Sequence, residues 1–198
     1  MKNAKSKNGM KIANYITFSR ILGALLIPAL LILEIPRIYT FFLYITFALT
    51  DVLDGFISRL RKDKPKETDG DIFDPVADKA LFICTLIVLI GVQDIPNLAS
   101  SIIVLREIMV LGLRASAERH GFQIKSSISA KLKTLAGNVA VSAYILKDEY
   151  FGISAQFVGD VSFVLCFALA VVSGAQYITT YIKEIQKIKN TSLKNTST

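Results

Sequence analysis

Six stretches of this chain are apolar over a length that can cross a membrane. A membrane-spanning helix needs about 20 mainly apolar residues, and such runs cover residues 17–35, 37–58, 75–92, 97–117, 128–146 and 153–181. Together they take up most of the 198 residues, which leaves only short loops between them. We therefore predict an all-α integral membrane protein with six transmembrane helices, formed as a single domain over residues 1–198.

The composition argues against several other classes of protein. Hydrophobic residues make up 52% of the chain and charged residues 20%, and the charges are concentrated between the apolar runs. A soluble enzyme, a disordered segment and a disulfide-stapled secreted module do not have this distribution. The net charge of +7 fits the Lys/Arg-rich cytoplasmic loops of a membrane protein, and we expect no nucleic-acid partner. Cys84 and Cys166 lie far apart inside apolar runs, and we expect neither a disulfide nor a zinc site.

The distribution of Lys and Arg predicts the orientation in the membrane. Seventeen of the 23 lie in the basic N-terminal segment 1–11, the loop 59–66, the stretch 119–133 and the C-terminal tail, whereas two lie in the intervening loops. Because positively charged loops remain in the cytoplasm, we expect a multi-pass protein of the cell membrane, in contact with membrane lipids, with both termini cytoplasmic. We expect the polar tail, about residues 186–198, to be frayed.

Four aspartates lie at the cytoplasmic ends of the second and third apolar runs. A charged side chain within a membrane costs roughly 2.5–3.5 kcal/mol on insertion scales, so such residues usually pair or line a cavity. Asp51 and Asp54 are three residues apart, and Asp74 and Asp78 are four apart. On a helix each spacing places both carboxylates on one face, one turn apart. The alternative is that these aspartates cap helices and face water.

Converging carboxylates would repel one another unless a cation neutralised them. Oxygen ligands alone favour hard divalent metals such as Mg2+, Mn2+ or Ca2+, and four carboxylates suffice for a two-metal site that clamps a transferring phosphate. Gly55 and Gly70 let a ligand approach the backbone closely, and the Arg59 guanidinium is suited to a phosphate. We therefore predict a metal site at the cytoplasmic side that handles a phosphate ester.

The pattern Asp-x2-Asp-Gly-x2-Ser-Arg, followed by Gly-x3-Asp-x3-Asp and running from Asp51 to Asp78, resembles the signature of the CDP-alcohol phosphatidyltransferase family. Two departures are Ser58, where the family usually has Ala, and a slightly longer spacer between Arg59 and Gly70. Six spans with cytoplasmic termini also match the family, so the resemblance covers nearly the whole chain. It implies a bundle of the CDP-alcohol phosphotransferase type, in which an alcohol attacks the phosphorus of a CDP-linked lipid and CMP leaves.

The resemblance also implies a role for each matching residue, in an active site on the cytoplasmic side. The implied ligands of two divalent cations, Mg2+ or Mn2+, are Asp51, Asp54, Asp74 and Asp78. Asp78 would also act as the general base for the attacking hydroxyl. The residues implied to contact CDP-diacylglycerol are Gly55, Arg59, Thr68, Asn14, Thr17 and Arg20. The last three could instead form an interfacial helix with a hydroxyl cap and a snorkelling Arg. The resemblance also implies a homodimer, and we expect one here.

Charged residues of the fourth and fifth apolar runs bear on the acceptor alcohol. Arg106 and Arg114 are eight residues apart, about two helical turns, and so share roughly one face. With Lys131 and Lys133 they make four cations, which favour a negatively charged acceptor, a phosphorylated alcohol. The alternative is that Arg106 pairs with Glu107 within the bundle and that the two lysines only follow the positive-inside rule.

Three further patterns are similar to the branch of the family that makes phosphatidylglycerophosphate: Arg-Glu-x2-Val-x3-Arg, Lys-x-Lys-Thr and Ser173-Gly174-x2-Tyr177. This similarity implies sn-glycerol 3-phosphate as the acceptor. Alternatives within the family are inositol phosphate, serine, or phosphatidylglycerol to give cardiolipin. Serine would need fewer cations, and phosphatidylglycerol would need a second lipid groove. A cation or proton transporter is a further alternative, but its carboxylates would follow a path instead of clustering at one membrane face.

Overall fold

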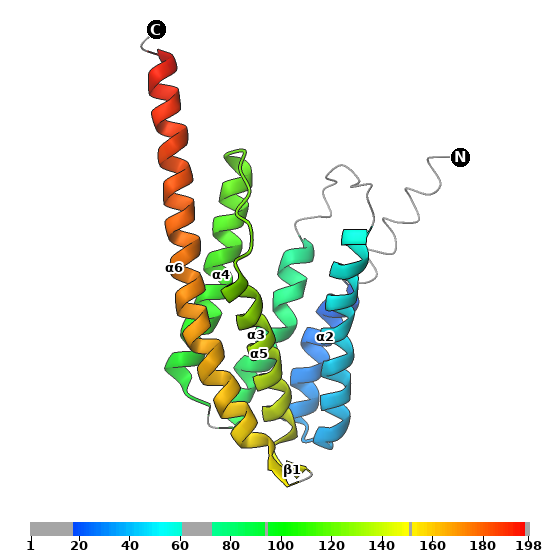
Figure 1. Ribbon diagram of the computed structural model, residues 1–198. Coiled ribbons are helices and arrows are strands. Elements are labelled where there is room, and N and C mark those ends of the chain that lie inside the picture. Colours follow the sequence, from blue (N-terminus) through cyan, green and yellow to red (C-terminus); the bar gives the residue numbers. More distant parts are fainter. Residues whose placement is uncertain (1–17, 61–72, 94, 151, 197–198) are drawn as a thin grey trace, which may run out of the picture. The chain divides into compact units, whose positions relative to one another are not determined.

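The computed structural model describes residues 18–60, 73–93, 95–150 and 152–196, and within them no side chains at 50–60, 73–75, 77–78, 150 and 191–196. Almost all of this part of the chain is helical (Figure 1). The helices are Phe18–Ile32, α2 (Arg37–Leu60), α3 (Phe73–Gln93), α4 (Asn97–Arg119), α5 (Ile128–Leu146) and α6 (Ala155–Thr196). A short antiparallel hairpin, β1 (Glu149–Tyr150) and β2 (Ile153–Ser154), joins α5 to α6 and pairs Glu149 with Ser154.

Each described helix corresponds to one of the predicted apolar runs, which confirms the all-helical class apart from the small hairpin. Prolines define several of the helix starts. Pro36 and Pro96 directly precede α2 and α4, and Pro75 lies in the first turn of α3. Proline fixes φ near its helical value and needs no backbone N–H partner at these positions.

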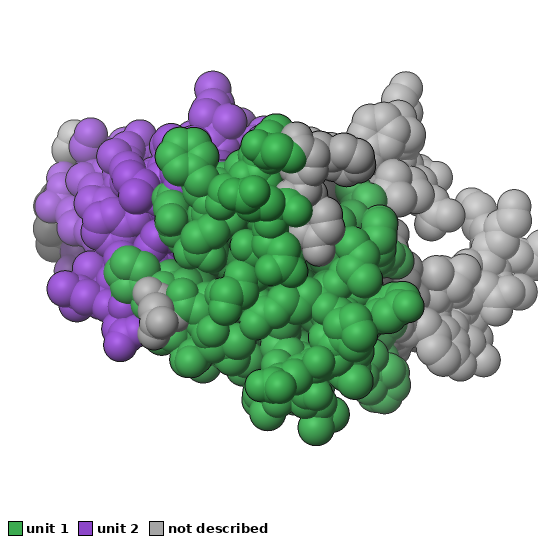
Figure 2. Space-filling model, turned by 90° about the horizontal axis from the view of Figure 1, so that it is seen from below, with its two compact units in different colours: residues 1–96, 138–160 green, residues 97–137, 161–198 purple. Residues whose placement is uncertain are grey.

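The chain divides into two compact units, each made from two separate stretches (Figure 2). Unit 1 comprises Met1–Pro96 and Asn138–Asp160, and unit 2 comprises Asn97–Gly137 and Val161–Thr198. The single domain over residues 1–198 remains a prediction. The chain enters unit 2 at α4, returns to unit 1 within α5 and leaves it again within α6, so neither unit is continuous in sequence.

Unit 1 packs the helix Phe18–Ile32, α2, α3 and the second half of α5 around an apolar core that contains two tyrosines. Tyr44 is fully buried on α2, and its hydroxyl donates to Asn138 Oδ1 on α5 at 2.9 Å. The Tyr144 hydroxyl on α5 donates to Asp160 Oδ1, at the start of α6, at 2.9 Å. Other buried residues are Ile27, Leu31, Leu86, Leu89, Val141 and Ile145. The tyrosines add apolar area to the core while their hydroxyls remain paired.

Unit 2 packs α4 against α6 and the first half of α5. Its buried cluster, with the side chains packed on it, consists of Val110, Ala130, Tyr177, Leu113 and Ile124. Further along the same two helices, the hydroxyls of Ser116 on α4 and Tyr181 on α6 lie 2.8 Å apart. This contact and the buried cluster align α4 with α6.

The last helix is longer than expected. The segment Ala155–Asn190 of α6 is the one helix in the described part of the chain that is long and apolar enough to cross a membrane, while Phe18–Ile32, Arg37–Leu49 and Lys79–Gln93 are apolar but shorter. The tail that we expected to be frayed continues α6 as a helix to Thr196. The ion pair between Glu184 and Lys187, with Lys187 Nζ 2.7 Å from Glu184 Oε1 at a spacing of three residues, supports this extension.

Candidate active site

The four predicted metal ligands lie on two helices of unit 1. Asp51 and Asp54 are on α2, and Asp74 and Asp78 are on α3. The end of α2 and the beginning of α3 lie at the same end of unit 1, drawn uppermost in Figure 1. Because both segments are helical, each pair of aspartates is separated by about one turn. The backbone therefore brings the two acidic segments to one end of this unit.

The side chains of these aspartates lie outside the described residues, as does the side chain of Arg59. Among the side chains that the structure describes, no group of three or more His, Cys, Asp or Glu could hold a metal ion. The predicted donor set consists of carboxylates alone, which fits a hard divalent cation. The assignment of these aspartates as metal ligands remains a prediction.

Of the residues predicted to contact CDP-diacylglycerol, Arg20 is the one whose side chain is described. It lies on the helix Phe18–Ile32 of unit 1 and is only 6% exposed. A snorkelling arginine at the membrane interface would be exposed at its charged end, so the burial of Arg20 argues against that alternative. Asn14, Thr17 and Thr68 lie outside the described residues, and Gly55 lies on the described backbone of α2.

A buried network of charges joins α4, α5 and α6 in unit 2. Glu107 Oε1 accepts a hydrogen bond from Arg106 Nη1 at 2.9 Å and another from Lys133 Nζ, and both contacts are ion pairs. Arg106 Nη2 donates to Ser173 Oγ on α6 at 2.9 Å. Arg106 is 7% exposed, Glu107 and Lys133 are 1% exposed, and Ser173 is 0% exposed. Charges at this depth are costly unless they are paired.

Tyr177 of α6 contacts both arginines of α4. The guanidinium carbon of Arg106 lies 5.5 Å from the centre of the Tyr177 ring, and that of Arg114 lies 5.3 Å from it. Arg114 Nη2 also donates to the Tyr177 hydroxyl at 2.5 Å. The eight-residue spacing therefore does bring both arginines to one face of α4, where both make cation–π contacts with one buried aromatic ring.

Two donors in this network have no hydrogen-bond partner among the described residues. The Nε atoms of Arg106 and Arg114 are buried and make no hydrogen bond within the described residues. Buried donors in folded proteins are almost always satisfied, so these atoms point to a missing acceptor. Among the described side chains, Glu107 pairs with Arg106 and Lys133, and Arg114 contacts Tyr177. An anion with several oxygens, such as a phosphate ester, could accept from both Nε donors.

Lys131 does not join this network. It is exposed and forms no ion pair within the described part of the chain, whereas Lys133 is buried. Residues two apart on a helix do not face the same way, so α5 directs the two lysines to different surroundings. The pairing of Arg106 with Glu107 that the sequence left open is present, and Lys133 shares the same carboxylate.

A family model described as CDP-alcohol phosphatidyltransferase matches residues 10–182 of this chain. The match includes the acidic segments of α2 and α3 and the charged network of α4, α5 and α6. This chain belongs to the CDP-alcohol phosphatidyltransferase family. The assignment made from the aspartate pattern is confirmed, and the protein is an enzyme of this class. Members of the family are membrane-associated and generally depend on divalent cations.

Several relatives carry a more specific name. The CDP-diacylglycerol–glycerol-3-phosphate 3-phosphatidyltransferase of Rickettsia typhi is 30% identical to this phosphatidyltransferase over 172 residues, which cover 84% of this chain and 94% of the relative. The enzyme of the same name from Bacillus subtilis is 31% identical over 137 residues, covering 69% and 70%. A probable phosphatidylglycerophosphate synthase of Mycobacterium tuberculosis is 27% identical over 191 residues, covering 92% and 88%.

The sequence alone predicts no site role for three residues of the phosphatidyltransferase network: Glu107, Ser173 and Tyr177. A signal for Glu107 was present, because a carboxylate inside an apolar run is seldom placed without a partner. Ser173 and Tyr177 are four residues apart and therefore share one face of the last helix. Their contact with Arg106 and Arg114 joins positions more than 60 residues apart in sequence.

Proposed function

We propose that this phosphatidyltransferase transfers the phosphatidyl group of CDP-diacylglycerol to sn-glycerol 3-phosphate, which releases CMP and forms phosphatidylglycerophosphate. A hydroxyl oxygen of the acceptor forms a bond to the phosphorus that carries the diacylglycerol, and the bond from this phosphorus to CMP breaks. The names of the Rickettsia and Bacillus relatives support this reaction. The single observation that carries the choice of acceptor is the pair of arginines, Arg106 and Arg114, gathered around the buried Tyr177.

The metal-binding part of the proposal uses the aspartates of α2 and α3. The proposed ligands of two divalent cations, Mg2+ or Mn2+, are Asp51, Asp54, Asp74 and Asp78. When bound, such metals stabilise the negative charge of the diphosphate and of the departing CMP. Asp78, in its ionised form, accepts the proton that the attacking hydroxyl loses. The helical spacing of each pair, and the shared end of unit 1 at which α2 ends and α3 begins, support this assignment.

The donor nucleotide is proposed to contact residues that precede, follow or adjoin the acidic segments. Gly55 directly follows Asp54 on α2, and Arg59 lies five residues after Asp54; a small residue here admits a ligand, and a guanidinium binds phosphate oxygens. The buried Arg20 of unit 1 is a third candidate. The remaining proposed contacts are Asn14, Thr17 and Thr68.

The acceptor phosphate is proposed to bind the cations of unit 2. Arg106 and Arg114 offer their Nε donors, and Lys133 offers its positive charge. Lys131, exposed on α5, would attract the anion without being buried against it. Serine, which has no phosphate, would offer no phosphate oxygens to the buried Nε donors of Arg106 and Arg114.

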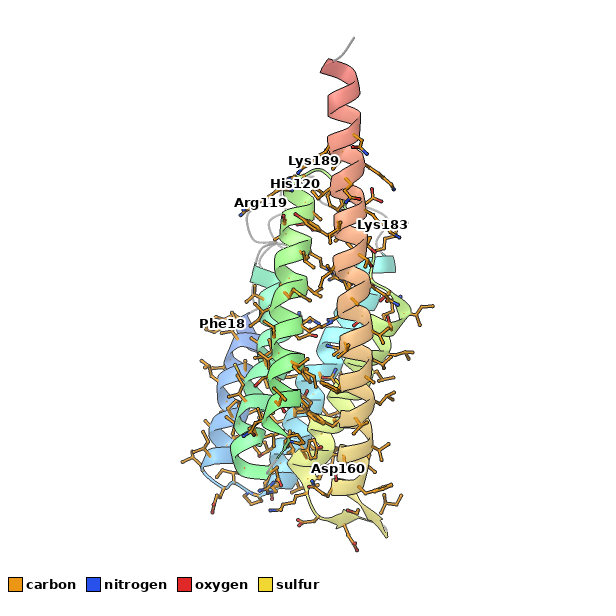
Figure 3. The ribbon with its side chains drawn as sticks, turned by 90° about the vertical axis from the view of Figure 1, so that its left-hand side faces the viewer. Phe18, Arg119, His120, Asp160, Lys183 and Lys189 are labelled. Carbon is orange, nitrogen blue, oxygen red and sulfur yellow. The ribbon has the colours of Figure 1, made fainter. Side chains whose placement is uncertain are left out.

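The proposed setting is the cell membrane, with six spans and with both termini and the active site cytoplasmic. Large apolar side chains point away from the protein on the helix Phe18–Ile32, on α4 and on α6: Leu25, Leu105 and Val164 are 66%, 65% and 66% exposed. Lipid chains would keep such apolar side chains away from water. In unit 2 the labelled cations Arg119, Lys183 and Lys189 gather toward one end, as the positive-inside rule requires (Figure 3). The family resemblance further suggests a homodimer.

The test is CMP release by the detergent-solubilised protein with CDP-diacylglycerol and either Mg2+ or Mn2+. We expect release with sn-glycerol 3-phosphate, and none after chelation of the metal. Release only with inositol phosphate, serine or phosphatidylglycerol would reassign the acceptor. If no acceptor released CMP with either metal, the proposed reaction would be wrong.

A further inference from the structure

We propose that Tyr177 is a positioning residue that holds Arg106 and Arg114 in the arrangement that binds the phosphate of the acceptor. The inference rests on the proposed function and adds to it the residue that makes the enzyme select a phosphorylated alcohol. Tyr177 is 2% exposed and sits on α6, whereas both arginines sit on α4. It contacts the acceptor site through these arginines and is not itself a catalytic residue.

The ring of Tyr177 holds both cations on one side of α4. Two guanidinium carbons within 5.5 Å and 5.3 Å of one ring centre place both arginines within the range of a cation–π contact. Such a contact is stronger when it is desolvated, as it is around a ring that is almost completely buried. Long arginine side chains otherwise lose considerable rotamer freedom when they are fixed. The ring therefore orders both arginine side chains before the acceptor binds, which reduces the entropy that is lost when the acceptor phosphate binds.

The polar groups of α6 orient each guanidinium so that its Nε remains available. Ser173 Oγ accepts from Arg106 Nη2 at 2.9 Å, and the Tyr177 hydroxyl accepts from Arg114 Nη2 at 2.5 Å. The buried Nε atom of each arginine has no partner within the described residues. Each guanidinium is thus held at its outer nitrogens, while its Nε hydrogen is left for a ligand. An anion that accepts from both would complete the network.

Gly174 lies beside the Arg106 side chain. A Cβ atom at residue 174 would lie 3.4 Å from Arg106 Cγ and 3.6 Å from Met109 Cε, which is ordinary van der Waals contact. The three residues Ser173, Gly174 and Tyr177 therefore form one wall of the arginine site. The contacts with Arg106 and Arg114 give a physical reason for a polar residue at 173 and an aromatic residue at 177.

Tyr181 offers a matched control. It lies four residues after Tyr177 on the same helix, and its hydroxyl makes a hydrogen-bonding contact with α4, 2.8 Å from Ser116 Oγ. Its ring packs against Phe122 at 5.9 Å between ring centres. Replacement of either tyrosine by Phe removes one hydroxyl contact between α4 and α6, but only Tyr177 contacts the arginines within the described residues.

The experiment measures KM for sn-glycerol 3-phosphate and for CDP-diacylglycerol in wild type, Tyr177→Phe, Tyr177→Leu and Tyr181→Phe. Tyr177→Phe keeps the ring and should raise KM for sn-glycerol 3-phosphate about tenfold, since one hydrogen bond to a charged group is lost. Tyr177→Leu removes the ring as well and should raise it by about a hundredfold. KM for CDP-diacylglycerol should change less than about twofold in every variant, as should both constants in Tyr181→Phe.

A second readout separates the inference from the proposed reaction. Inorganic phosphate should raise the unfolding temperature of the solubilised wild type and of Tyr181→Phe, and it should no longer do so in Tyr177→Leu. If the wild type turns over sn-glycerol 3-phosphate but the Tyr177 variants keep its KM, the positioning role is overturned and the reaction stands. If the wild type releases no CMP, the proposed reaction is wrong. The role of Tyr177 is then tested by the phosphate-dependent rise in unfolding temperature, and an equal rise in Tyr177→Leu and wild type would overturn it. Equal rises in both KM values would show a merely structural effect and overturn the inference.

Discussion

At the scale of single residues, Asp78 carries the most specific chemical role. We expect Asp78→Asn to abolish CMP release, because an amide cannot accept the proton of the acceptor hydroxyl and is a poor ligand for a hard cation. The protein should still fold, since Asp and Asn differ little in volume. The assay is CMP release at saturating concentrations of both substrates, with the thermal unfolding temperature measured in parallel.

The matched control for this substitution is Asp148→Asn, at an exposed position just after α5. It removes the same charge away from the predicted metal site and should leave the rate unchanged. A near-normal rate in Asp78→Asn would remove this residue from the role of base.

Glu107 should matter chiefly for stability. Glu107→Ala leaves Arg106 and Lys133 without their shared carboxylate in a buried setting, and loss of one partner from a buried ion pair costs about 3–5 kcal/mol. We expect a much lower unfolding temperature in detergent for this variant. Glu118→Ala, at an exposed position on the same helix, should change stability by less than about 0.5 kcal/mol. Equal unfolding temperatures for the two variants would contradict the network described above.

The sequence identifies the charged positions within the bundle but not their partners. The positions of the charged side chains within apolar runs could be read directly, because each such charge is an exception to the membrane-spanning pattern. The sharing of Glu107 by Arg106 and Lys133 could not be read, since it depends on how α5 packs on α4. The same holds for Tyr177, whose partner Arg114 lies 63 residues earlier.

At the scale of elements, apolar length and proline positions predict where the helices lie to within a few residues. The prediction was weakest at the end of α6, where we expected a frayed polar tail. Isoleucines at residues 182, 185 and 188 recur at helical spacing there, and Lys187 pairs with Glu184. A helix stabilised by such local contacts needs no apolar surroundings to continue. The division into two units also escaped prediction, because it depends on packing between distant segments.

The start of α6 gives a prediction about packing. A Cβ atom at Gly159 would lie 2.8 Å from the buried ring of Tyr144, so that ring would have to move and its bond to Asp160 would be disturbed. We expect Gly159→Ala to destabilise the protein by about 1–3 kcal/mol, the usual cost of overpacking. Thermal unfolding in detergent measures this effect.

Gly91→Ala on α3 is the control, because nothing lies within 4 Å of its added Cβ. Alanine favours helix over glycine by about 1 kcal/mol, so this variant should be neutral or slightly more stable. The packing account would be wrong if Gly159→Ala were as stable as Gly91→Ala.

At the scale of the whole molecule, the predicted topology can be tested by labelling with a membrane-impermeant maleimide. In a background with Cys84→Ala and Cys166→Ala, we expect Glu149→Cys, in the hairpin before α6, to react in intact cells. Lys189→Cys, near the far end of α6, should react only after the membrane is permeabilised. The helix between these positions is long enough to cross a hydrocarbon core of about 30 Å. Reaction of Lys189→Cys in intact cells would reverse the proposed orientation.

The central claim is that a phosphorylated alcohol becomes part of a lipid. The most direct measurement is the transfer of carbon-14 from labelled sn-glycerol 3-phosphate into the lipid fraction, followed together with CMP release in the presence of CDP-diacylglycerol and Mg2+ or Mn2+. We predict that labelled lipid and CMP form in equal amounts, that the lipid retains the acceptor phosphate, and that Asp78→Asn forms neither product. CMP release without label in the lipid would instead show hydrolysis of the donor and would contradict the account.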